Sequence, residues 1–493
     1  MVSPMFDARL TGSAIGGFLP AEPEGSTRRR VLMVTHDFPP SLTMAGETCA
    51  QIARYLPLYG WDPIVLTARD PDAGDQDASS GGLLPRTVIR TGAIPHPFTI
   101  YKRLKTYKRL TTRSRSRSDA AAGGQAGSRT SGLLRRWVLS LLQVPDVYSG
   151  WIPPAVIAGL GAIRRHGVEH LFSASPHSSG HLVGLALARL SGLPWTAQFQ
   201  DPWTYPPAQW EEAKLVSAAS VRLETALERM VLRRADAVVC VTDRHTAWLR
   251  GAHPDVRAGK FVTILNGFDS IEWERVDEET ARSQPASKDT FVITYAGTLY
   301  LRRSPLPLFR ALRSLIDSGD VVPERVRVDL LGQCDVADGI DVTSMAAACG
   351  LTGCVRVTGP LGRAEALRRV AQSDLLLLLA EGLTQQIPGK AYEYLRAGRP
   401  ILALTSEGAV ADLLRLTGGA WVVDPADQTN VTAAVLEAYR LWRSGRPGPR
   451  PDPRVVAGFD RRVLAGEFAG LFNRALAGSA GRAKPGRPVT ASG

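Results

Sequence analysis

The feature that most limits how this chain can fold is a repeated alternation of short apolar runs with longer helix-compatible segments. Five runs rich in β-forming residues lie in the first half, at 31–35, 64–67, 170–174, 195–199 and 237–241. Most are apolar on both faces, which is typical of parallel strands covered by helices on both sides. Helix-compatible segments such as 45–59 and 180–190 lie between them. The pattern predicts a doubly wound α/β domain with right-handed crossovers.

The alternation stops at a polar stretch and then restarts. We expect further strands at 291–295, 326–330, 355–357, 374–379, 400–404 and 421–423. The fold class is therefore α/β, with two Rossmann-like domains in tandem and a ligand cleft between the carboxyl ends of their sheets. The expected parts are a disordered extension (1–27), an N-terminal domain (28–272), a linker (273–290), a C-terminal domain (291–455), a helix (456–476) and a disordered tail (477–493).

Length and composition agree with two globular domains. The chain has 493 residues, of which 44% are hydrophobic and 22% are charged, so each half is long enough to bury a core. No apolar run reaches the roughly 18 residues that span a bilayer, and the first residues lack the basic and apolar segments of a signal peptide. We expect a cytoplasmic protein. The five cysteines show no metal-binding spacing and predict no disulfide framework.

Most of the formal charge of +12 lies in one segment. Residues 102–136 contain eleven Lys or Arg and one acidic residue, Asp119, a net of +10. The rest of the chain is close to neutral, so nucleic acid is not an expected partner. Residues 102–132 form a basic low-complexity insertion in the N-terminal domain. With the following Leu and Trp residues, 102–136 would suit an anionic membrane surface, where each Lys or Arg contributes about 1 kcal/mol. A solvated loop before a core helix is the alternative.

The most informative stretch is residues 385–402, QQIPGKAYEYLRAGRPIL. It predicts a helix that begins at Pro388 and Gly389, directly after a strand and a turn, and ends at Gly398. The free N–H groups at such a helix start hold anions, and Lys390 adds a cation beside them. Glu393, one turn later, is placed to accept hydrogen bonds from a ribose. This pattern predicts a nucleotide site, although strand, turn and helix also follow one another in α/β proteins without one.

The motif PGKAYEYLRAGRPIL resembles the donor site of glycosyltransferase family 4 and its relatives, which are retaining enzymes of the GT-B fold. The resemblance extends over about residues 31–476. Further landmarks follow in the family's order at 38–40 with 45–47, 190–203, 233–242, 264–269 and 295–299.

The resemblance implies roles for particular residues. Donor binding would fall to Gly297, Thr298, Arg303, Pro388, Gly389, Lys390 and Glu393, with Glu393 on the ribose and most of the others around the diphosphate. Gly46, Glu47 and Gln200 would face the acceptor, and Asp201 would stand at the reaction centre. Cations and a helix start stabilise the diphosphate as it leaves, so we expect neither a metal nor any cofactor beyond the nucleoside diphosphate sugar.

Two positions depart from the family pattern. Gln385 replaces the first Glu of the E-x7-E pair that ends at Glu393, and Gln200 replaces a common His. Glutamine cannot carry charge or take a proton. Glu381 is one candidate for the missing carboxylate, and the donor phosphate is another group that can take the acceptor's proton. His177, at a strand end, would bind the acceptor or assist proton transfer.

Other polar residues receive structural interpretations. We expect His181 to have a structural partner, Glu224 and Glu228 to form a solvated helix face, and the sequence Asp70-Pro71-Asp72 to be an acidic turn rather than a metal site.

The expected activity is transfer of a sugar from a nucleoside diphosphate to a hydroxyl acceptor. A lipid-linked acceptor in cell-surface polysaccharide or glycolipid assembly, at the inner face of the plasma membrane, is the favoured context. A natural-product acceptor, a non-catalytic nucleotide-sugar-binding protein and a nucleotide-sugar epimerase remain open. Nothing in the sequence selects the sugar or the base.

Overall fold

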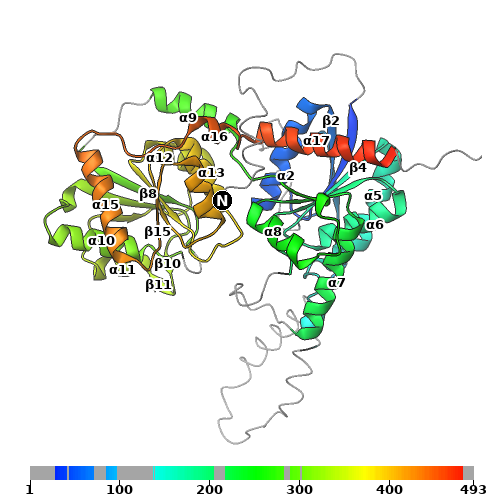
Figure 1. Cartoon of the computed structure of the whole chain (residues 1–493), viewed down its shortest axis with the longest axis horizontal. Helices are drawn as coiled ribbons and strands as arrows, with labels where there is room; N and C mark the ends of the chain where they lie inside the picture. The colour runs from blue at the N-terminus through cyan, green and yellow to red at the C-terminus, as the bar shows by residue number, and fades with distance from the viewer. Residues whose placement is uncertain are drawn as a thin grey trace, which may run out of the picture. The chain divides into compact units, whose positions relative to one another are not determined.

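The computed structural model describes residues 28–40, 44–70, 85–96, 137, 139–204, 217–282, 289–299 and 303–480. These residues divide into two compact units (Figure 1). The N-terminal unit comprises residues within 28–240, 249–262 and 465–480, and the C-terminal unit comprises 241–248 and residues within 263–464. The extension 1–27, most of the loop at Asp70 and the whole basic segment 102–136 lie outside the described residues.

The N-terminal unit contains a sheet of seven strands in the order β3-β2-β1-β4-β5-β6-β7. The strands are β1 (Arg29–Val34), β2 (Trp61–Ala68), β3 (Thr87–Thr91), β4 (His170–Ala174), β5 (Trp195–Phe199), β6 (Ala237–Cys240) and β7 (Phe261–Thr263). The pairs from β3 to β6 are parallel, and Val31 of β1 lies opposite Pro63 on one side and His170 on the other. The five predicted strands are present, and β3 and β7 are additional.

Helices pack on both faces of this sheet, as the apolar strands predicted. They are α2 (Met44–Tyr55), α5 (Ile152–His166), α6 (Ser179–Ser191), α7 (Ala218–Arg234) and the later part of α17 (Arg461–Ala480), with short 3-10 turns at η1 (Leu56–Tyr59), η2 (Ser149–Trp151) and η4 (Ala258–Lys260). Helix α8 (Asp243–Ala252) begins in the C-terminal unit and ends in the N-terminal unit. Consecutive residues of β4 contact helices on opposite faces: Ser173 bonds to a histidine of α6, whereas Phe172 contacts Phe468 and Phe472 of α17.

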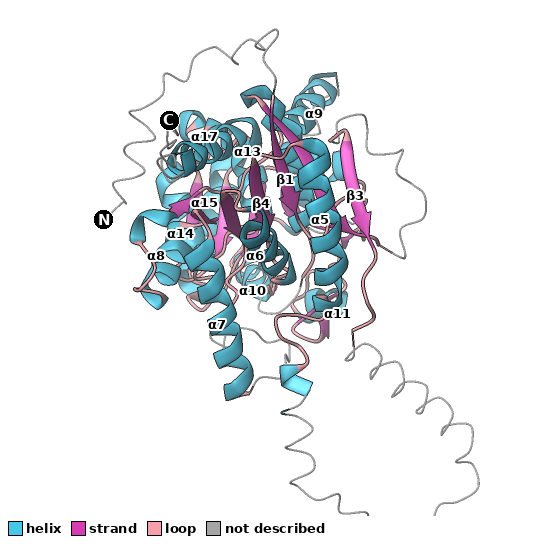
Figure 2. Ribbon diagram, turned by 90° about the vertical axis from the view of Figure 1, so that its right-hand side faces the viewer, coloured by secondary structure: helices cyan, strands magenta, loops and turns pink. Residues whose placement is uncertain are grey.

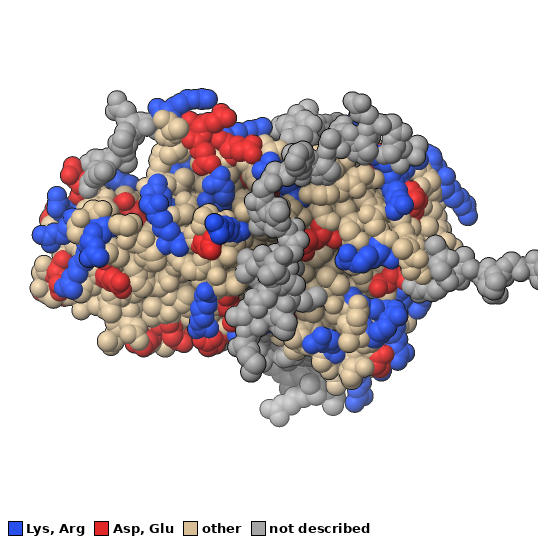
Figure 3. Space-filling model, turned by 45° about the horizontal axis from the view of Figure 1, so that its top comes forward, with Lys and Arg blue, Asp and Glu red and all other residues tan. Residues whose placement is uncertain are grey.

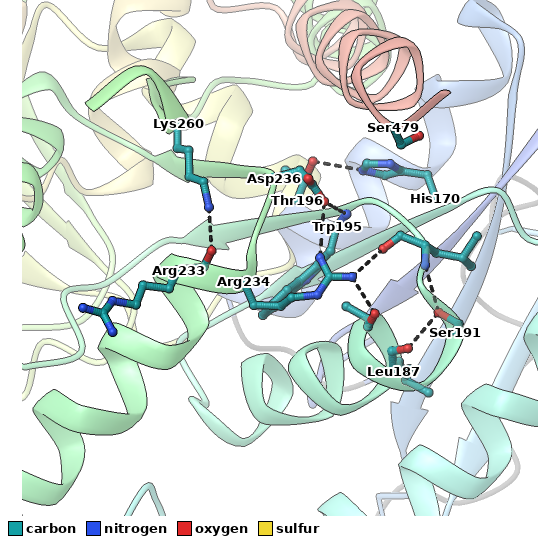
Figure 4. Close-up of polar contacts among 12 residues, drawn as sticks. His170, Leu187, Ser191, Trp195, Thr196, Arg233, Arg234, Asp236, Lys260 and Ser479 are labelled. Carbon is teal, nitrogen blue, oxygen red and sulfur yellow. Dashed lines mark hydrogen bonds and ion pairs between the residues drawn. The ribbon is translucent and has the colours of Figure 1, made fainter. Parts of the chain in front are cut away.

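Arg234, the last residue of α7, fixes the start of β5 (Figure 4). Its guanidinium donates to the carbonyl oxygens of Ala188 at 2.5 Å and Leu193 at 3.1 Å. Asp236 accepts from the backbone N–H of Trp195 at 3.0 Å. These contacts anchor the amino end of β5.

The C-terminal unit contains a fully parallel sheet in the order β12-β9-β8-β13-β14-β15. Its strands are β8 (Phe291–Ala296), β9 (Val326–Leu331), β12 (Val355–Val357), β13 (Leu375–Leu379), β14 (Ile401–Leu404) and β15 (Ala420–Val423). Each was predicted. The two-residue strands β10 (Val336–Ala337) and β11 (Ile340–Asp341) form a small separate hairpin that the sequence did not predict.

Two cores cover the two faces of the second sheet. Leu375, Leu377 and Leu379 of β13 pack with α10 (Leu306–Asp317), α11 (Val342–Ala348) and α15 (Gln428–Arg443). Leu376 and Leu378 pack with α9 (Ser270–Arg282), α12 (Arg363–Gln372), α13 (Gly389–Ala397), α14 (Ala409–Thr417) and α16 (Pro453–Ala457). The continuous leucine run therefore follows from the period of two of a strand that is buried on both faces.

The structure corrects two predicted boundaries. Residues 273–282 of the expected linker belong to α9, whose Trp273 and Val276 are buried in the core of the C-terminal unit. The acidic residues around them hid this helical spacing. The helix expected at 456–476 is divided into α16 and α17, and α17 continues to Ala480, into the expected tail. Within the described residues, no helix has the length and hydrophobicity needed to cross a membrane.

Candidate functional site

Each sheet has one point where the strand order reverses, and ligands of open α/β sheets bind outside the carboxyl ends of the strands at that point. In the N-terminal unit this point lies between β1 and β4, which are neighbours in the sheet (Figure 2). In the C-terminal unit it lies between β8 and β13. The structure places several predicted site residues at these two points.

Glycines line the carboxyl ends of β8 and β9. Gly297, directly after β8, has a φ of 136°, and its N–H donates to the carbonyl oxygen of Leu331 at 2.7 Å. Gly332, directly after β9, has a φ of 112°, and its N–H donates to Gly359 at 2.8 Å. A Cβ on Gly297 would collide with Lys390 Nζ, so glycine here keeps the backbone close to the lysine.

Lys390 lies in the first turn of α13, the helix that the sequence predicted. The helix begins after Pro388 and ends at Gly398, which has a φ of 65°. Lys390 Nζ is buried and lies 3.8 Å from the centre of the Tyr295 ring. It has no hydrogen-bond partner among the described residues. A buried ammonium without such a partner is costly in the free protein and is poised to take an anionic ligand.

The surroundings of Lys390 disfavour its charge. Burial, followed by the positive charge of Arg303, lowers the pKa of Lys390 to about 7, although Cys334 and Glu393 oppose this shift. The Cys334 thiol lies 3.2 Å from the carbonyl oxygen of Gly297, and burial raises its pKa to about 11. The thiol is therefore neutral at pH 7. Lys390 thus lies at the start of a helix, where N–H groups also favour negative charge, and close enough to Arg303 for the two positive charges to repel.

Glu393, the residue predicted to bind a ribose, is already paired with an arginine. It forms an ion pair with Arg363 at 2.7 Å, and Arg363 also bonds to Glu272 at 3.0 Å. A ribose hydroxyl would therefore meet a carboxylate that is already held in place. The next residue, Tyr394, accepts through its hydroxyl from the N–H of Ala296 at 2.8 Å, which ties α13 to the end of β8.

Three further residues were predicted for donor binding or catalysis: Thr298, Gln385 and Glu381. Thr298 is exposed, and its carbonyl oxygen accepts from the Tyr295 hydroxyl at 2.8 Å. The carbonyl oxygen of Gln385 accepts from Thr242 at 2.6 Å, and its side-chain Oε1 is buried with no hydrogen-bond donor among the residues that the structure describes. Glu381 is exposed in the turn after β13.

A second cluster lies at the reversal point of the N-terminal sheet. His36 and Asp37 follow β1, and His177 follows β4. Asp37 lies 2.7 Å from His36 Nδ1 through one carboxylate oxygen and 3.3 Å from His177 Nε2 through the other. Burial would raise the pKa of Asp37, but the hydrogen bonds from His177 and His36 outweigh it and hold this pKa well below its usual range.

Aromatic rings and backbone contacts hold this cluster. The Tyr148 ring lies 4.2 Å from the His36 ring and 4.3 Å from the His177 ring, centre to centre. Asp146 accepts from the N–H of Tyr148 at 2.9 Å and from the N–H of Ser179, the first residue of α6, at 2.8 Å. Burial, together with the charges of Asp37 and Asp146, raises the pKa of Tyr148, so its hydroxyl stays protonated.

The residues predicted on the acceptor side lie at a helix start and in a loop of the same unit. Gly46 and Glu47 lie in the first turn of α2, and Glu47 accepts from Gln51 at 3.4 Å. Gln200 and Asp201 follow β5; the N–H of Gln200 donates to Ser175 at 3.2 Å, and its side-chain Nε2 is buried with no hydrogen-bond partner in the described part of the chain. Parallel β4 and β5 are neighbours, so these residues share the sheet edge that carries His177.

The predictions for three helix residues have different outcomes. His181 has the structural partner that was expected, since its Nδ1 lies 2.9 Å from Ser173 Oγ, and burial lowers its pKa to about 3. The solvated face predicted for Glu224 and Glu228 is wrong: their exposed fractions are 8% and 0%. Glu228 lies 2.8 Å from His253 Nε2 and accepts from Thr204 at 2.5 Å. Helix α7 therefore supports the loop that contains Asp201.

Sequence reasoning did not identify His36, Asp37, Tyr148, Tyr295 or Arg363 as site residues. The position of His36 and Asp37 directly after the first predicted strand was an available signal. Tyr148, Tyr295 and Arg363 could not be found from spacing, because each contacts site residues that are distant from it in the sequence.

Comparisons with known proteins support the architecture. No protein-family model matches the chain, and no curated protein matches it. Sucrose-phosphate synthase from Thermosynechococcus elongatus has a similar structure, with a TM-score of 0.59 and 14% identity over 92% of this chain and 100% of that one. HepE from Anabaena in complex with UDP and glucose has a TM-score of 0.52 and 15% identity over 92% and 100%. The α,α-trehalose 6-phosphate synthase from Burkholderia multivorans has a TM-score of 0.53 and 13% identity over 94% and 100%. These proteins are GT-B glycosyltransferases, and the chain has the GT-B fold.

Proposed function

We propose that this protein is a glycosyltransferase that moves a sugar from a nucleoside diphosphate sugar to a hydroxyl acceptor. The observation that carries the proposal is the buried ammonium of Lys390, which lacks a hydrogen-bond partner in the described structure and lies at the start of α13. Lys390 lies near the point where the strand order reverses, and Rossmann-like domains bind nucleotides at that point. The likeness in fold to HepE, which was solved with UDP-glucose, supports the same class of ligand.

The donor side would work by differential stabilisation. When the bond from the sugar C1 to the diphosphate breaks, negative charge grows on the phosphate oxygens. Lys390, Arg303 and the N–H groups that follow Pro388 would stabilise this charge more strongly in the transition state than in the ground state. Gly297 would let a phosphate approach the backbone closely, and Glu393 would hold the ribose. The charge on these groups is sufficient for the diphosphate, so we expect donor binding to need no metal.

The acceptor would bind in the N-terminal unit near Gly46, Glu47, Gln200 and Asp201. Its oxygen forms a bond to C1 as the bond to the diphosphate breaks, and its proton passes to a phosphate oxygen of the leaving group. This route gives retention and needs no protein base. It fits a donor motif in which Gln385 replaces a carboxylate, with exposed Glu381 as the alternative proton acceptor.

The biological context rests on charge. Over the face shown in Figure 3, basic and acidic side chains are interspersed and do not form one basic surface. The net charge of +10 at residues 102–136 therefore stands apart, and it favours an anionic membrane, a lipid-linked acceptor and a location at the inner face of the plasma membrane. Sedimentation with anionic vesicles, with and without residues 102–136, tests this context. Equal binding by both forms would favour a small natural-product acceptor.

A panel of nucleotide sugars tests the activity itself. The donor that stabilises the protein most against heating is then incubated alone and with hydroxyl acceptors, and the products are analysed. We expect slow hydrolysis alone, faster transfer with an acceptor, and loss of both in Lys390→Met. Lys260→Met is the matched control, since Lys260 donates to a backbone carbonyl of Arg233 outside the site. Binding without turnover would identify a non-catalytic nucleotide-sugar-binding protein, and an altered free donor would identify an epimerase.

A further inference from the structure

We propose that His36, Asp37 and His177 form a binding site for a divalent transition metal ion of the zinc class. The site lies at the strand-order reversal of the N-terminal sheet. This metal site goes beyond the proposed function, because the residues proposed to bind the nucleotide sugar lie in the C-terminal unit. The spacing of cysteine and histidine in the sequence did not predict it.

The donor atoms suit such an ion. Each of the three residues offers one ligand atom, and these atoms lie within 4.8 Å of one another. Two imidazoles and one carboxylate are a common set for zinc and other first-row metals, with bonds of about 2.0–2.2 Å. Tetrahedral ligands with such bonds are about 3.4 Å apart. The contacts from Asp37 to His36 and His177 are 2.7 and 3.3 Å, so small movements would admit an ion.

The ligand side chains are already held in place. Thr35 Oγ1 donates to the carbonyl oxygen of Asp37 at 2.9 Å, and Thr67 Oγ1 donates to that of His36 at 2.8 Å. The Tyr148 ring contacts both imidazoles, and the His36 ring lies 5.4 Å from Trp151. Fixed ligands lose little conformational freedom on binding, which favours affinity.

The cluster is open on one side. The exposed side-chain fractions are 14% for His36, 12% for Asp37 and 25% for His177, so an ion has access from solvent. Three protein ligands leave a fourth position for water or another oxygen ligand, as in zinc sites that bind substrates. With both imidazoles neutral, the three side chains carry one negative charge, which attracts a dication.

The competing interpretation is a metal-free chain of hydrogen bonds, imidazole to carboxylate to imidazole. The two differ in a measurable way. A metal ion binds the ring nitrogens that face Asp37, so the proton on each of them must move to the other ring nitrogen or be released. An imidazole protonated on both nitrogens cannot bind the ion, so the affinity for metal falls as the pH is lowered, and removal of any one ligand side chain weakens binding strongly.

Zinc binding to the full chain tests the proposal. The protein is treated with EDTA, freed of chelator and titrated with ZnCl2 in a calorimeter, and with CoCl2 while the visible spectrum is recorded. We expect one ion per chain and the absorption of cobalt with nitrogen and oxygen ligands. His36→Ala, His177→Ala and Asp37→Asn should each weaken binding by about 100-fold or more, since loss of a mere supporting group costs about 10–100-fold. His166→Ala, at the half-buried carboxyl end of α5, is the matched control and should bind as the wild type does.

A measurement on unaltered protein guards against variants that fail to fold. Zinc should protect His36 and His177 of the wild-type chain from diethyl pyrocarbonate, as followed by peptide mass spectrometry, and should leave His166 reactive. The proposal is overturned if the wild type binds no zinc, if folded cluster variants bind as well as the control, or if zinc leaves His36 and His177 as reactive as before.

Discussion

The affinity for UDP should fall steeply above pH 7, because Lys390, which we propose binds the diphosphate, is easily deprotonated in the free protein. Burial and the charge of Arg303 lower the pKa of Lys390 to about 7. A bound diphosphate favours the ammonium, so the pKa of Lys390 rises in the complex. Binding above pH 7 must therefore take up a proton. The terminal phosphate of UDP is mostly ionised from pH 7 upward, and uracil begins to lose its N3 proton near pH 9, so the Lys390→Met variant separates the contribution of the lysine from that of the nucleotide.

The magnitude follows from the fraction of charged lysine. With a pKa of about 7, roughly one half of Lys390 is protonated at pH 7 and about one hundredth at pH 9. The affinity for UDP should then fall about 50-fold over these two units, or about 2.3 kcal/mol at 1.36 kcal/mol per decade. Near pH 9, close to one proton should be taken up for each UDP bound.

Isothermal titration calorimetry of UDP at pH 7, 8 and 9, in buffers with different ionisation enthalpies, measures both quantities. Lys390→Met should bind UDP weakly at every pH with no proton uptake, and Lys260→Met should behave as the wild type does. An affinity that is constant from pH 7 to 9 in the wild type, or a pH dependence that survives in Lys390→Met, would refute the reasoning.

Three further substitutions have definite expected outcomes. Lys390→Met removes a buried ammonium without a hydrogen-bond partner, so the ligand-free protein should be stabilised by about 1–3 kcal/mol, seen as a higher Tm. Gly297→Ala places a methyl group against Lys390 Nζ at a φ of 136° and should weaken UDP binding at least tenfold, as calorimetry would show. Gly398→Ala is its control, because the space around Gly398 is open and the change should leave UDP binding intact. Glu228→Ala leaves His253 buried without its carboxylate and should cost about 3 kcal/mol in urea unfolding; a loss below 1 kcal/mol would contradict the buried pair.

The sequence predicted the sheets well because their strands are apolar on both faces. The run Leu375–Leu379 is an example, since its residues alternate between two cores. Elements with weaker patterns were not predicted. Strand β3 is half-buried along its whole length, β7 has only three residues, and acidic neighbours concealed the buried Trp273 of α9.

The sequence predicted the backbone of the candidate donor site where that backbone is local in sequence. Pro388, Gly389 and Lys390 are consecutive, and a helix start is visible from the pattern alone. The Tyr295 ring beneath Lys390 and the ion pair of Glu393 with Arg363 depend on how β8, α12 and α13 pack, which no spacing encodes. The same is true of Asp37 and His177, which are brought together because β1 and β4 are neighbours.

A crystal structure of the full chain with UDP tests the central claim most directly. We predict a diphosphate oxygen within about 3 Å of Lys390 Nζ and the N–H groups of the first turn of α13, with the ribose at Glu393. A nucleotide bound elsewhere, with the Lys390 ammonium still lacking an anionic partner, would contradict the account.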